Sequence, residues 1–242
     1  MDYKIALFSK LTRFAYRFNV RKNRYLVVQQ QWMREALGNL LKFPQDRIIV
    51  SSPSFSFPQI PVVERTGETV FFYPSTADCH KNFETFCAAS ALLENKIGNG
   101  RFRSVITLTG NENKYASWLY NRFKDISSIE FRGFLPKEKL LNMYGSADCL
   151  VFPSRSETWG LPISEFKSTG KPMILADLPY SHETSKGSDK VAFFSPSDIS
   201  ALAQRMEEVI DGNLSSFADV PVEAYKEPVA NSWNALFELL LN

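Results

Sequence analysis

Short apolar runs alternate with amphipathic helical segments through residues 66–212, and this alternation limits the possible folds more than any other feature of the sequence. The apolar runs lie at 68–74, 103–110, 129–134, 148–154, 171–177 and 190–196. The helical segments lie at 82–96, 114–125, 136–147, 161–170 and 197–212. Each run is almost continuously apolar, as expected for strands that helices cover on both faces. The alternation therefore predicts an α/β fold with a doubly wound parallel sheet.

Residues that favour helix ends stand at the borders of the helical segments. Pro136 and Pro162 lie in predicted first turns, where the missing N–H of proline costs little. Gly145 and Gly170 lie where two helices are predicted to stop, and Ser197 is the predicted N-cap of the last helix. Ligands of such sheets bind beyond the carboxyl ends of the strands, so we expect the functional residues in the segments that follow the strands.

The chain divides into three segments that differ in pattern and charge. Residues 1–60 form an N-terminal stub with a predicted helix, strand and helix and a proline-rich linker, residues 61–212 form the sheet domain, and residues 213–242 form a helical extension interrupted near Pro228. Residues 1–50 carry ten Lys and Arg against three Asp and Glu, a net charge of +7, whereas the remainder carries 18 against 23, a net charge of −5. Such an asymmetry suggests units with different neighbours.

Composition argues against several classes of function. No stretch approaches the roughly 18 apolar residues of a membrane span. Two histidines, His80 and His182, leave few members for a His-based metal site or a Ser/His/Asp triad. The cysteines, Cys79, Cys87 and Cys149, form no CxxC pair and leave an odd thiol, which favours a reduced, cytoplasmic chain. The basic N-terminal segment holds no RNA-binding motif, so no nucleic-acid partner is expected.

Residues 156–172 place two carboxylates, Glu157 and Glu165, around a glycine and a predicted helix start. The order strand, loop, helix leaves the amides of Trp159–Leu161 in a first turn, where N–H groups lack helical partners and favour an anion such as phosphate. The two glutamates can accept hydrogen bonds from hydroxyls on either side of that anion, a layout that suits a nucleotide sugar. Two solvated surface glutamates would give the same spacing, so the pattern alone leaves both interpretations open.

The segment 133–177 resembles the donor-binding half of the retaining glycosyltransferases of family 4 (group 1), which have the GT-B fold with Rossmann-like domains. The ordered motif of the family is matched by Pro153, Ser154, Glu157, Gly160, Leu161, Pro162, Glu165, Gly170, Lys171 and Pro172. The resemblance covers residues 66–212 well and residues 25–50 more loosely. It implies that a hexose is transferred from a UDP- or GDP-sugar with retention of anomeric configuration, in the synthesis of surface polysaccharide or another glycan.

The resemblance also implies roles for individual residues. Glu157 would hold a hydroxyl of the donor sugar, and Glu165 would hold the ribose hydroxyls. The amides from Thr158 to Leu161 would hold the diphosphate, and Phe134 and Leu135 would line the base.

Gly110 closes a predicted strand, and the loop that follows it is expected to contact the donor. Lys81 matches the lysine that neutralises the departing diphosphate in this family. With Glu157, this lysine forms the expected catalytic pair. A fixed cation and backbone amides can stabilise the leaving group without a metal, so we expect neither a metal nor a cofactor. One family cation is replaced: Thr76 stands where the family has an arginine, and Arg155 or Lys114 could substitute for it.

About 60 residues precede the donor-binding half, so the resemblance predicts a truncated N-terminal, acceptor-side domain. The predicted helix at 6–24 carries Leu and Phe on one stripe and Lys and Arg on another. A partner chain, a second copy of this chain or the inner face of a membrane could cover it, or it could be an ordinary solvated helix. Two functions stay open: a glycosyltransferase that acts on a glycan or lipid-linked acceptor, and a partner-dependent subunit that binds a nucleotide sugar without transferring it.

Overall fold

The computed structural model describes residues 3–54, 60 and 67–241. The chain divides into two compact units: unit 1 comprises Met1–Ser56 and Glu223–Asn242, and unit 2 comprises Phe57–Val222. The predicted helical extension at 213–242 is thus shared, because its first residues pair with unit 2 through an antiparallel bridge between Val191 and Ala218. Most of the predicted linker, residues 55–59 and 61–66, lies outside the described residues.

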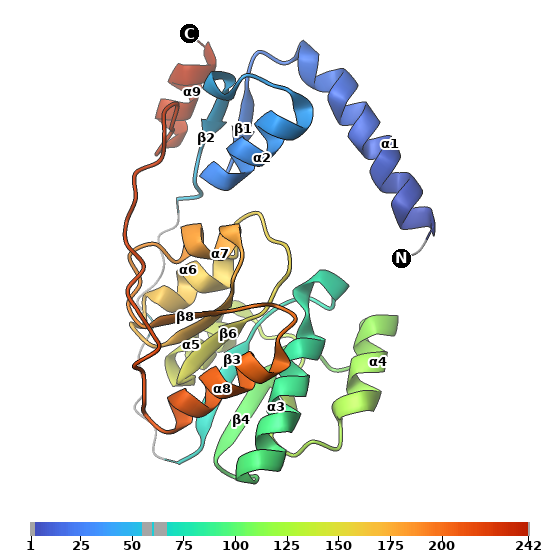
Figure 1. Ribbon diagram of the computed structural model, residues 1–242, viewed down its shortest axis with the longest axis vertical. Coiled ribbons are helices and arrows are strands. Elements are labelled where there is room, and N and C mark those ends of the chain that lie inside the picture. Colours follow the sequence, from blue (N-terminus) through green and yellow to red (C-terminus); the bar gives the residue numbers. More distant parts are fainter. Residues whose placement is uncertain (1–2, 55–59, 61–66, 242) are drawn as a thin grey trace. The chain divides into compact units, whose positions relative to one another are not determined.

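Unit 2 is built on a six-stranded parallel sheet whose strand order is β5-β4-β3-β6-β7-β8 (Figure 1). Its strands are β3 (Thr69–Tyr73), β4 (Phe102–Ile106), β5 (Ile129–Phe131), β6 (Cys149–Phe152), β7 (Met173–Ala176) and β8 (Val191–Phe194). From β3 the chain continues through β4 to β5 at one edge of the sheet. It then crosses back to β6, beside β3, and continues through β7 to β8 at the other edge. The predicted doubly wound parallel sheet is confirmed, and its strand order reverses between β3 and β6.

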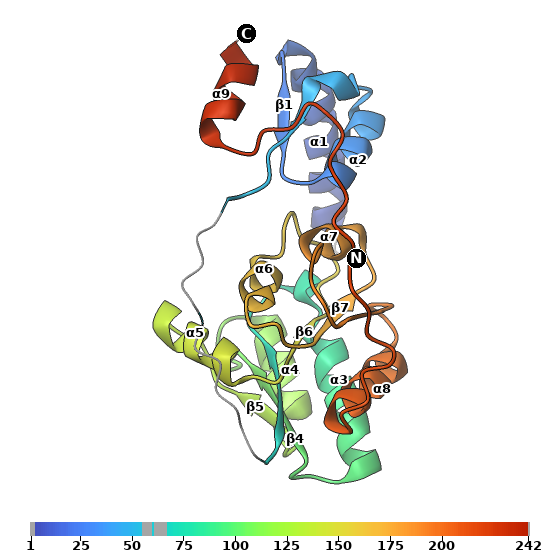
Figure 2. The ribbon, with the colours of Figure 1, turned by 90° about the vertical axis from the view of Figure 1, so that its left-hand side faces the viewer.

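Helices cover both faces of this sheet, as Figures 1 and 2 show. One face is covered by α3 (Phe83–Ile97), α4 (Lys114–Phe123) and α8 (Ile199–Ile210). The other is covered by α5 (Lys137–Ser146), α6 (Leu161–Lys167) and α7 (Pro179–Thr184). The reversal at β3 and β6 explains this division, because right-handed crossovers that run toward opposite edges place their helices on opposite faces.

The central strand β3 shows why the strands are apolar on both sides. The Phe71 ring meets Phe102 with centroids 6.1 Å apart, and the Phe72 ring meets Tyr144 at 5.6 Å. All three residues from Phe71 to Tyr73 are completely buried. Burial of one such side chain contributes roughly 1.5–3 kcal/mol, so β3 anchors the sheet while its last residue, Tyr73, reaches the carboxyl edge.

Two helix starts differ from the sequence prediction, and two short helical segments were not expected. Asp198, not Ser197, is the N-cap of α8, because its carboxylate accepts a hydrogen bond from the Ala201 amide at 2.9 Å. Pro136 is the N-cap of α5 rather than a residue of its first turn. The short helix α7 was not expected from the sequence. A 3₁₀ turn, Cys79–Lys81, also precedes α3.

Unit 1 contains a two-stranded parallel sheet, β1 (Leu26–Val28) with β2 (Ile48–Val50), in the part of the chain that the structure describes. Its helices are α1 (Tyr3–Asn19), α2 (Gln31–Leu41) and α9 (Trp233–Leu241), with 3₁₀ turns at Val20–Lys22 and Gln45–Arg47. The strand β2 was missed in the sequence. The C-terminal helix begins only at Trp233, because the preceding segment is extended and bridges β2 between Val50 and Val229.

The returning C-terminal segment is held to unit 1 by a buried cation. Arg34, on α2, donates hydrogen bonds to the backbone carbonyls of Gln45, Lys226 and Glu227. A buried guanidinium is stable only where its donors are satisfied, and this residue is 4% exposed. Arg34 therefore fastens the 226–227 segment beside β2.

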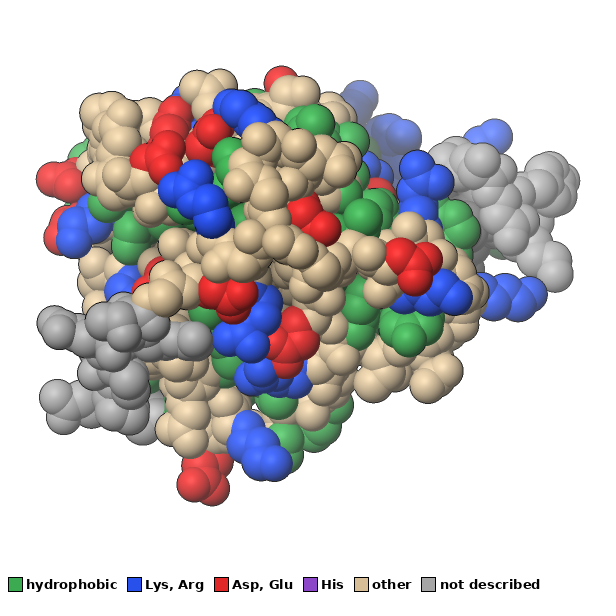
Figure 3. All heavy atoms as spheres, turned by 90° about the horizontal axis from the view of Figure 1, so that it is seen from below, with side chains coloured by type: hydrophobic (Ala, Val, Ile, Leu, Met, Phe, Trp, Pro, Cys, Tyr) green, Lys and Arg blue, Asp and Glu red, His purple; other side chains and the backbone are tan. Residues whose placement is uncertain are grey.

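Charges of both signs are mixed over the face shown in Figure 3, with no large area of one sign. On unit 2, Lys96 pairs with Glu207 and Arg101 pairs with Asp211. In the described ranges, no helix is both long enough and apolar enough to cross a bilayer.

Candidate functional site

Two loops meet where the strand order of unit 2 reverses. Because β3 and β6 pair directly, the segments that follow them emerge side by side at the carboxyl edge of the sheet. The carbonyl of His80, in the first loop, accepts hydrogen bonds from the Arg155 amide at 2.8 Å and the Ser154 hydroxyl at 3.3 Å, both in the second loop. A reversal point of this kind is where open α/β sheets bind ligands.

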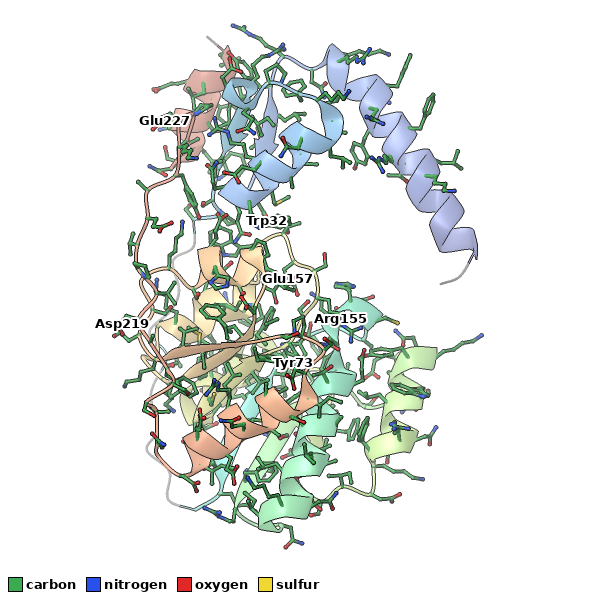
Figure 4. The ribbon with its side chains drawn as sticks, in the orientation of Figure 1. Trp32, Tyr73, Arg155, Glu157, Asp219 and Glu227 are labelled. Atoms are coloured by element: carbon green, nitrogen blue, oxygen red, sulfur yellow. The ribbon has the colours of Figure 1, made fainter. Side chains whose placement is uncertain are left out.

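The two predicted catalytic residues are in direct contact at this point. The Lys81 ammonium lies 2.7 Å from Oε1 of Glu157, and the two side chains are only 16% and 12% exposed. Glu157 and its neighbour Arg155 are labelled in Figure 4. A pair so shielded from water is much less screened than a surface ion pair. The site therefore holds one cation, suited to a phosphate, beside one carboxylate, suited to a hydroxyl.

The backbone around Lys81 is fixed by its neighbours. The Tyr73 hydroxyl donates to the Lys81 carbonyl at 2.8 Å. Burial is the main cause that raises the pKa of Tyr73, so this hydroxyl stays protonated and remains a donor. The next residue, Asn82, has a left-handed backbone with φ of 60°, and its side-chain amide donates to the carbonyls of Pro153 and Pro196. These bonds tie the lysine loop to the glutamate loop.

The loop that carries Glu157 is held in a similar way. The Tyr180 hydroxyl donates to the Ser154 carbonyl at 2.7 Å, and burial, followed by the nearby Glu157 charge, raises the pKa of Tyr180. Gly160 has φ of +88°, and a Cβ there would lie 3.2 Å from Ile163 Cδ1. The backbone conformation therefore favours glycine before α6, and a Cβ there would also crowd the Ile163 side chain.

The predicted anion site at the start of α6 stays a prediction. This helix has only seven residues, so Lys81 is the stronger source of positive charge at the site. The backbone carbonyl of Trp159 accepts a hydrogen bond from the Thr184 hydroxyl. The indole N–H of Trp159 donates to the Ser164 hydroxyl at 2.9 Å. Thr158 is exposed beside it.

A cavity of about 620 Å³ opens beside the ion pair's loops in unit 2. Four predicted donor-binding residues line it: Phe134, Leu135, Leu161 and Glu165. The Phe134 side chain is 85% exposed, which leaves its ring available to a ligand. Lys81, Glu157 and Thr158–Gly160 are not on this wall. The predicted residues thus fall into two groups: Lys81 and Glu157 form an ion pair, whereas the four residues named above line a largely apolar cavity.

Glu165 is held by a residue that the sequence analysis missed. The Tyr144 hydroxyl donates to Glu165 Oε2 at 2.8 Å, and Tyr144 itself lines the cavity. Burial, together with the charge of Glu165 and this hydrogen bond, raises the pKa of Tyr144 and keeps it a donor. This hydrogen bond involves only one oxygen of Glu165. It therefore orients the carboxylate and leaves the second oxygen able to accept a hydrogen bond from a ligand hydroxyl.

Gly110 does not line the cavity; it shapes the turn after β4. Its φ is +94°, and a Cβ there would lie 2.6 Å from Tyr120 Cβ. Its amide donates to Glu112, which also accepts from the Thr109 amide and hydroxyl. Burial alone would raise the pKa of Glu112, but these hydrogen bonds outweigh it and lower the pKa. Glu112, missed in the sequence, lines the cavity as a carboxylate.

Thr76 and the two residues suggested as substitutes for the expected arginine lie in the described part of the chain, and their contacts are as follows. The Thr76 hydroxyl donates to Asp78 at 2.8 Å on the cavity wall. Arg155, one suggested substitute, lies 3.4 Å from Glu84 and is 48% exposed. The other, Lys114, is the first residue of α4 and is exposed. Lys81 is therefore the cation that the structure places against Glu157.

Lys171, part of the matched motif, has a structural role. Its ammonium donates to the carbonyls of Gly145 and Ala147 at 2.8 and 2.7 Å. These carbonyls end α5, where a cation stabilises the negative end of the helix dipole. In residues 3–54, 60 and 67–241, no three His, Cys, Asp or Glu side chains form a metal-binding group, and the expected independence from metal stays a prediction.

Comparisons with known proteins show which family the chain resembles. A family model described as "Glycosyl transferases group 1" matches residues 59–226. The chain is 25% identical over 196 residues to O-antigen chain mannosyltransferase B of Escherichia coli, covering 74% of this chain and 49% of that protein. It is 21% identical over 174 residues to O-antigen chain mannosyltransferase RfbU of Salmonella typhimurium, covering 71% and 47%. The chain spans about half the length of these curated relatives.

A solved glycosyltransferase from Rickettsia africae has a similar fold. Its TM-score is 0.66 at 17% sequence identity, and the match covers 84% of this chain and 59% of that chain. The parallel sheet and flanking helices of unit 2 therefore match the fold of the GT-B glycosyltransferases.

Proposed function

Because the chain belongs to the group 1 glycosyl transferases, we propose that unit 2 binds a nucleoside diphosphate sugar and supports transfer of its sugar. The contact between Lys81 and Glu157 at the strand-order reversal is the observation that carries this proposal. It places the cation that a diphosphate needs within 2.7 Å of a carboxylate that can hold a sugar hydroxyl.

The geometry supports a placement for the remaining parts of the donor. The diphosphate binds Lys81, the sugar lies toward Glu157, and the nucleoside extends into the cavity of about 620 Å³. There Glu165, aimed by Tyr144, accepts from the ribose hydroxyls, and Phe134 packs against the base. The apolar walls suit a base, and the carboxylate suits a diol.

We propose that transfer occurs with retention and without a metal. The bond from the anomeric carbon to the β-phosphate oxygen breaks, and a bond to the acceptor hydroxyl oxygen forms on the same face of the sugar. The acceptor proton passes to the departing diphosphate. Lys81 stabilises the charge that develops on the β-phosphate, a contribution that a positioned donor can make at roughly 3 kcal/mol.

The sugar, the acceptor and the location are proposed from the named relatives. Both are O-antigen chain mannosyltransferases, so a mannosyl donor, as GDP- or UDP-sugar, is the first to test. The acceptor is a glycan or lipid-linked glycan of surface polysaccharide synthesis, at the cytoplasmic face of the membrane. The basic helix α1, whose Phe14 and Phe18 are 70% and 62% exposed, suits peripheral contact there or contact with a partner chain.

A second function is favoured by one observation. Thr76 occupies the place of a family cation, and Arg155 is paired with Glu84 instead of replacing it. A site with a single cation would stabilise the leaving diphosphate less well. The chain would then be a nucleotide-sugar-binding subunit whose turnover depends on a partner.

Calorimetry with UDP, GDP and their mannosyl and glucosyl derivatives separates these functions. We expect one nucleotide to bind, and its sugar derivative to bind more tightly because Glu157 gains a hydroxyl partner. Turnover of the bound donor, retained in excess EDTA, indicates the transferase. Binding without hydrolysis or transfer indicates the subunit. If no nucleotide or nucleotide sugar binds, the proposed function is wrong.

A further inference from the structure

Asn82 is a buried polar residue that touches no part of the donor proposed for unit 2. It follows Lys81 directly in the chain and is completely buried. It is also the N-cap of α3, a position where an asparagine side chain commonly accepts a hydrogen bond from the first turn of its own helix. Here the side chain makes no such capping bond. Its amide group is therefore available for bonds to other parts of unit 2.

The amide of Asn82 joins loops at the carboxyl edge of the sheet. Its nitrogen donates to the carbonyl of Pro153 at 2.9 Å and to the carbonyl of Pro196 at 2.8 Å. Pro153 follows β6 and leads to Glu157, whereas Pro196 follows β8 and leads to α8. An amide NH₂ group has two donors, so both are used. Asn82 thus connects the loops that follow three strands, β3, β6 and β8.

Thr85, in the first turn of α3, holds the Asn82 amide in this orientation. Its hydroxyl donates to Oδ1 of Asn82 at 2.8 Å and lies 3.2 Å from the carbonyl oxygen of Pro196. Because the two proline carbonyls can only accept, the NH₂ group must face them, and the Thr85 hydroxyl satisfies the amide oxygen that remains. Without this hydroxyl the buried amide oxygen would lose its donor, which favours a turned side chain.

The backbone of Asn82 limits which residue can make these bonds. Its φ of 60° lies in the left-handed region, which glycine and asparagine adopt more readily than other residues do. Glycine has no side-chain amide, and an ionised aspartate has no N–H to donate to two carbonyls. Asparagine satisfies both the backbone and the two carbonyls. The residue after Lys81 therefore sets the direction of its own loop and fixes that loop to the one that carries Glu157.

We propose that Asn82 and Thr85 are positioning residues, which act through Lys81 by holding its ammonium where a diphosphate binds. A turned Asn82 amide would release Pro153 and Pro196 and let the two loops that carry Lys81 and Glu157 shift relative to each other. This inference rests on the function proposed for unit 2, in which Lys81 binds the diphosphate. It adds that the alignment of Lys81 depends on a hydrogen-bonded pair beneath the site.

The test titrates the full chain and its variants with free UDP and GDP. Thr85→Val keeps the shape of the side chain and removes the hydroxyl, so we expect the Kd of the nucleotide that binds the wild type to rise about fivefold. Thr85→Ser keeps the hydroxyl and should stay within about twofold of the wild type.

Ser90→Ala is the matched control, because it removes a buried hydroxyl from further along the same helix. The Ser90 hydroxyl donates to the Phe86 carbonyl at 2.9 Å and lies 2.7 Å from the Ser104 hydroxyl, away from Asn82. This variant should leave the Kd within about twofold of the wild type. Circular dichroism and urea unfolding of each variant show that the folded chain is being titrated.

A double-mutant cycle distinguishes positioning from a general loosening of the fold. In a Lys81→Met background, Thr85→Val should change the Kd by less than about twofold, because the group that Thr85 positions is absent. NMR titration measures the weaker binding expected of this background. Asn82→Gly keeps the left-handed backbone and removes both amide bonds, so it provides a second variant with the same expected dependence on Lys81.

The outcomes separate this inference from the proposed function. A wild-type chain that binds neither UDP nor GDP contradicts the function proposed for unit 2. If the wild type binds one of them and both Thr85→Val and Asn82→Gly bind it as tightly, the positioning role is overturned and the function is not. An equal loss of affinity with and without the Lys81 ammonium overturns it as well, because the two residues would then act on the fold and not through Lys81.

Discussion

The contact between Lys81 and Glu157 makes a quantitative prediction about nucleotide binding. In the structure the Lys81 ammonium is paired with a carboxylate at 2.7 Å, so an incoming diphosphate must compete with that carboxylate. The variant Glu157→Gln removes the competing charge and keeps the shape of the side chain. We therefore expect this variant to bind a free nucleoside diphosphate more tightly than the wild type does.

The size of the effect follows from the geometry of the pair. Coulomb's law gives a gross attraction of about 6 kcal/mol for unit charges at this distance with an effective dielectric constant of 20. The net value is smaller, because both groups give up water to pair, and hydrogen bonds between charged groups contribute about 1.5–3 kcal/mol. Taking the lower end, the free diphosphate should bind about tenfold more tightly to Glu157→Gln.

Isothermal titration of free GDP or UDP and of the matching sugar derivative measures this effect. The sugar derivative should gain less than the free diphosphate, because Glu157→Gln weakens the acceptor for its sugar hydroxyl. Glu207→Gln is the matched control: it removes a carboxylate from another lysine, Lys96, but not from Lys81, and should change each Kd by less than about twofold. A tenfold loss of free diphosphate affinity in Glu157→Gln would refute the reasoning, since Glu157 would then assist rather than oppose the diphosphate.

Three further predictions concern the groups that position the site. Tyr144→Phe removes the donor to Glu165; urea unfolding should show a loss of about 1 kcal/mol, and calorimetry should show weaker nucleotide binding. Gly160→Ala forces a Cβ into a positive-φ backbone next to a side chain, so we expect the free energy of unfolding to fall by about 1–2 kcal/mol. The loss should be smaller for Gly170→Ala, where a Cβ meets nothing within 4 Å. Equal losses in the two variants would mean that packing at Gly160 is unimportant. In the native chain a thiol reagent should label Cys79 alone, because burial raises the pKa of the Cys87 and Cys149 thiols. Cys79 lies two residues before Lys81, so a saturating nucleotide should slow its labelling, and an unchanged rate would argue against a ligand there.

Regular elements of unit 2 could be predicted because each carries its own signal. The strand predicted at 148–154 has an apolar centre, Cys149–Phe152, and the helix at 197–212 has a clear periodicity, so both were found within a few residues. The strand β2 was missed because it has three residues and is identified by its pairing with β1. The N-cap of α8 was misplaced by one residue, since Ser197 and Asp198 both have side chains that can cap and the local backbone decides between them.

The chemistry of the site was predictable to a different extent. Lys81 and Glu157 could be named from the motif, but their contact could not be, because 76 residues separate them and only the pairing of β3 with β6 brings their loops together. Tyr144 and Glu112 gave no local signal, because a tyrosine or a glutamate in these segments reads equally well as core or surface. Their roles depend on partners fixed by tertiary structure.

A crystal structure of the chain with a bound GDP- or UDP-sugar tests the central claim most directly. The expected result is a diphosphate oxygen within hydrogen-bonding distance of the Lys81 ammonium, with Glu157 turned from the lysine to a sugar hydroxyl and Glu165 bonded to the ribose. A nucleotide bound elsewhere while Lys81 and Glu157 keep their 2.7 Å contact would contradict it.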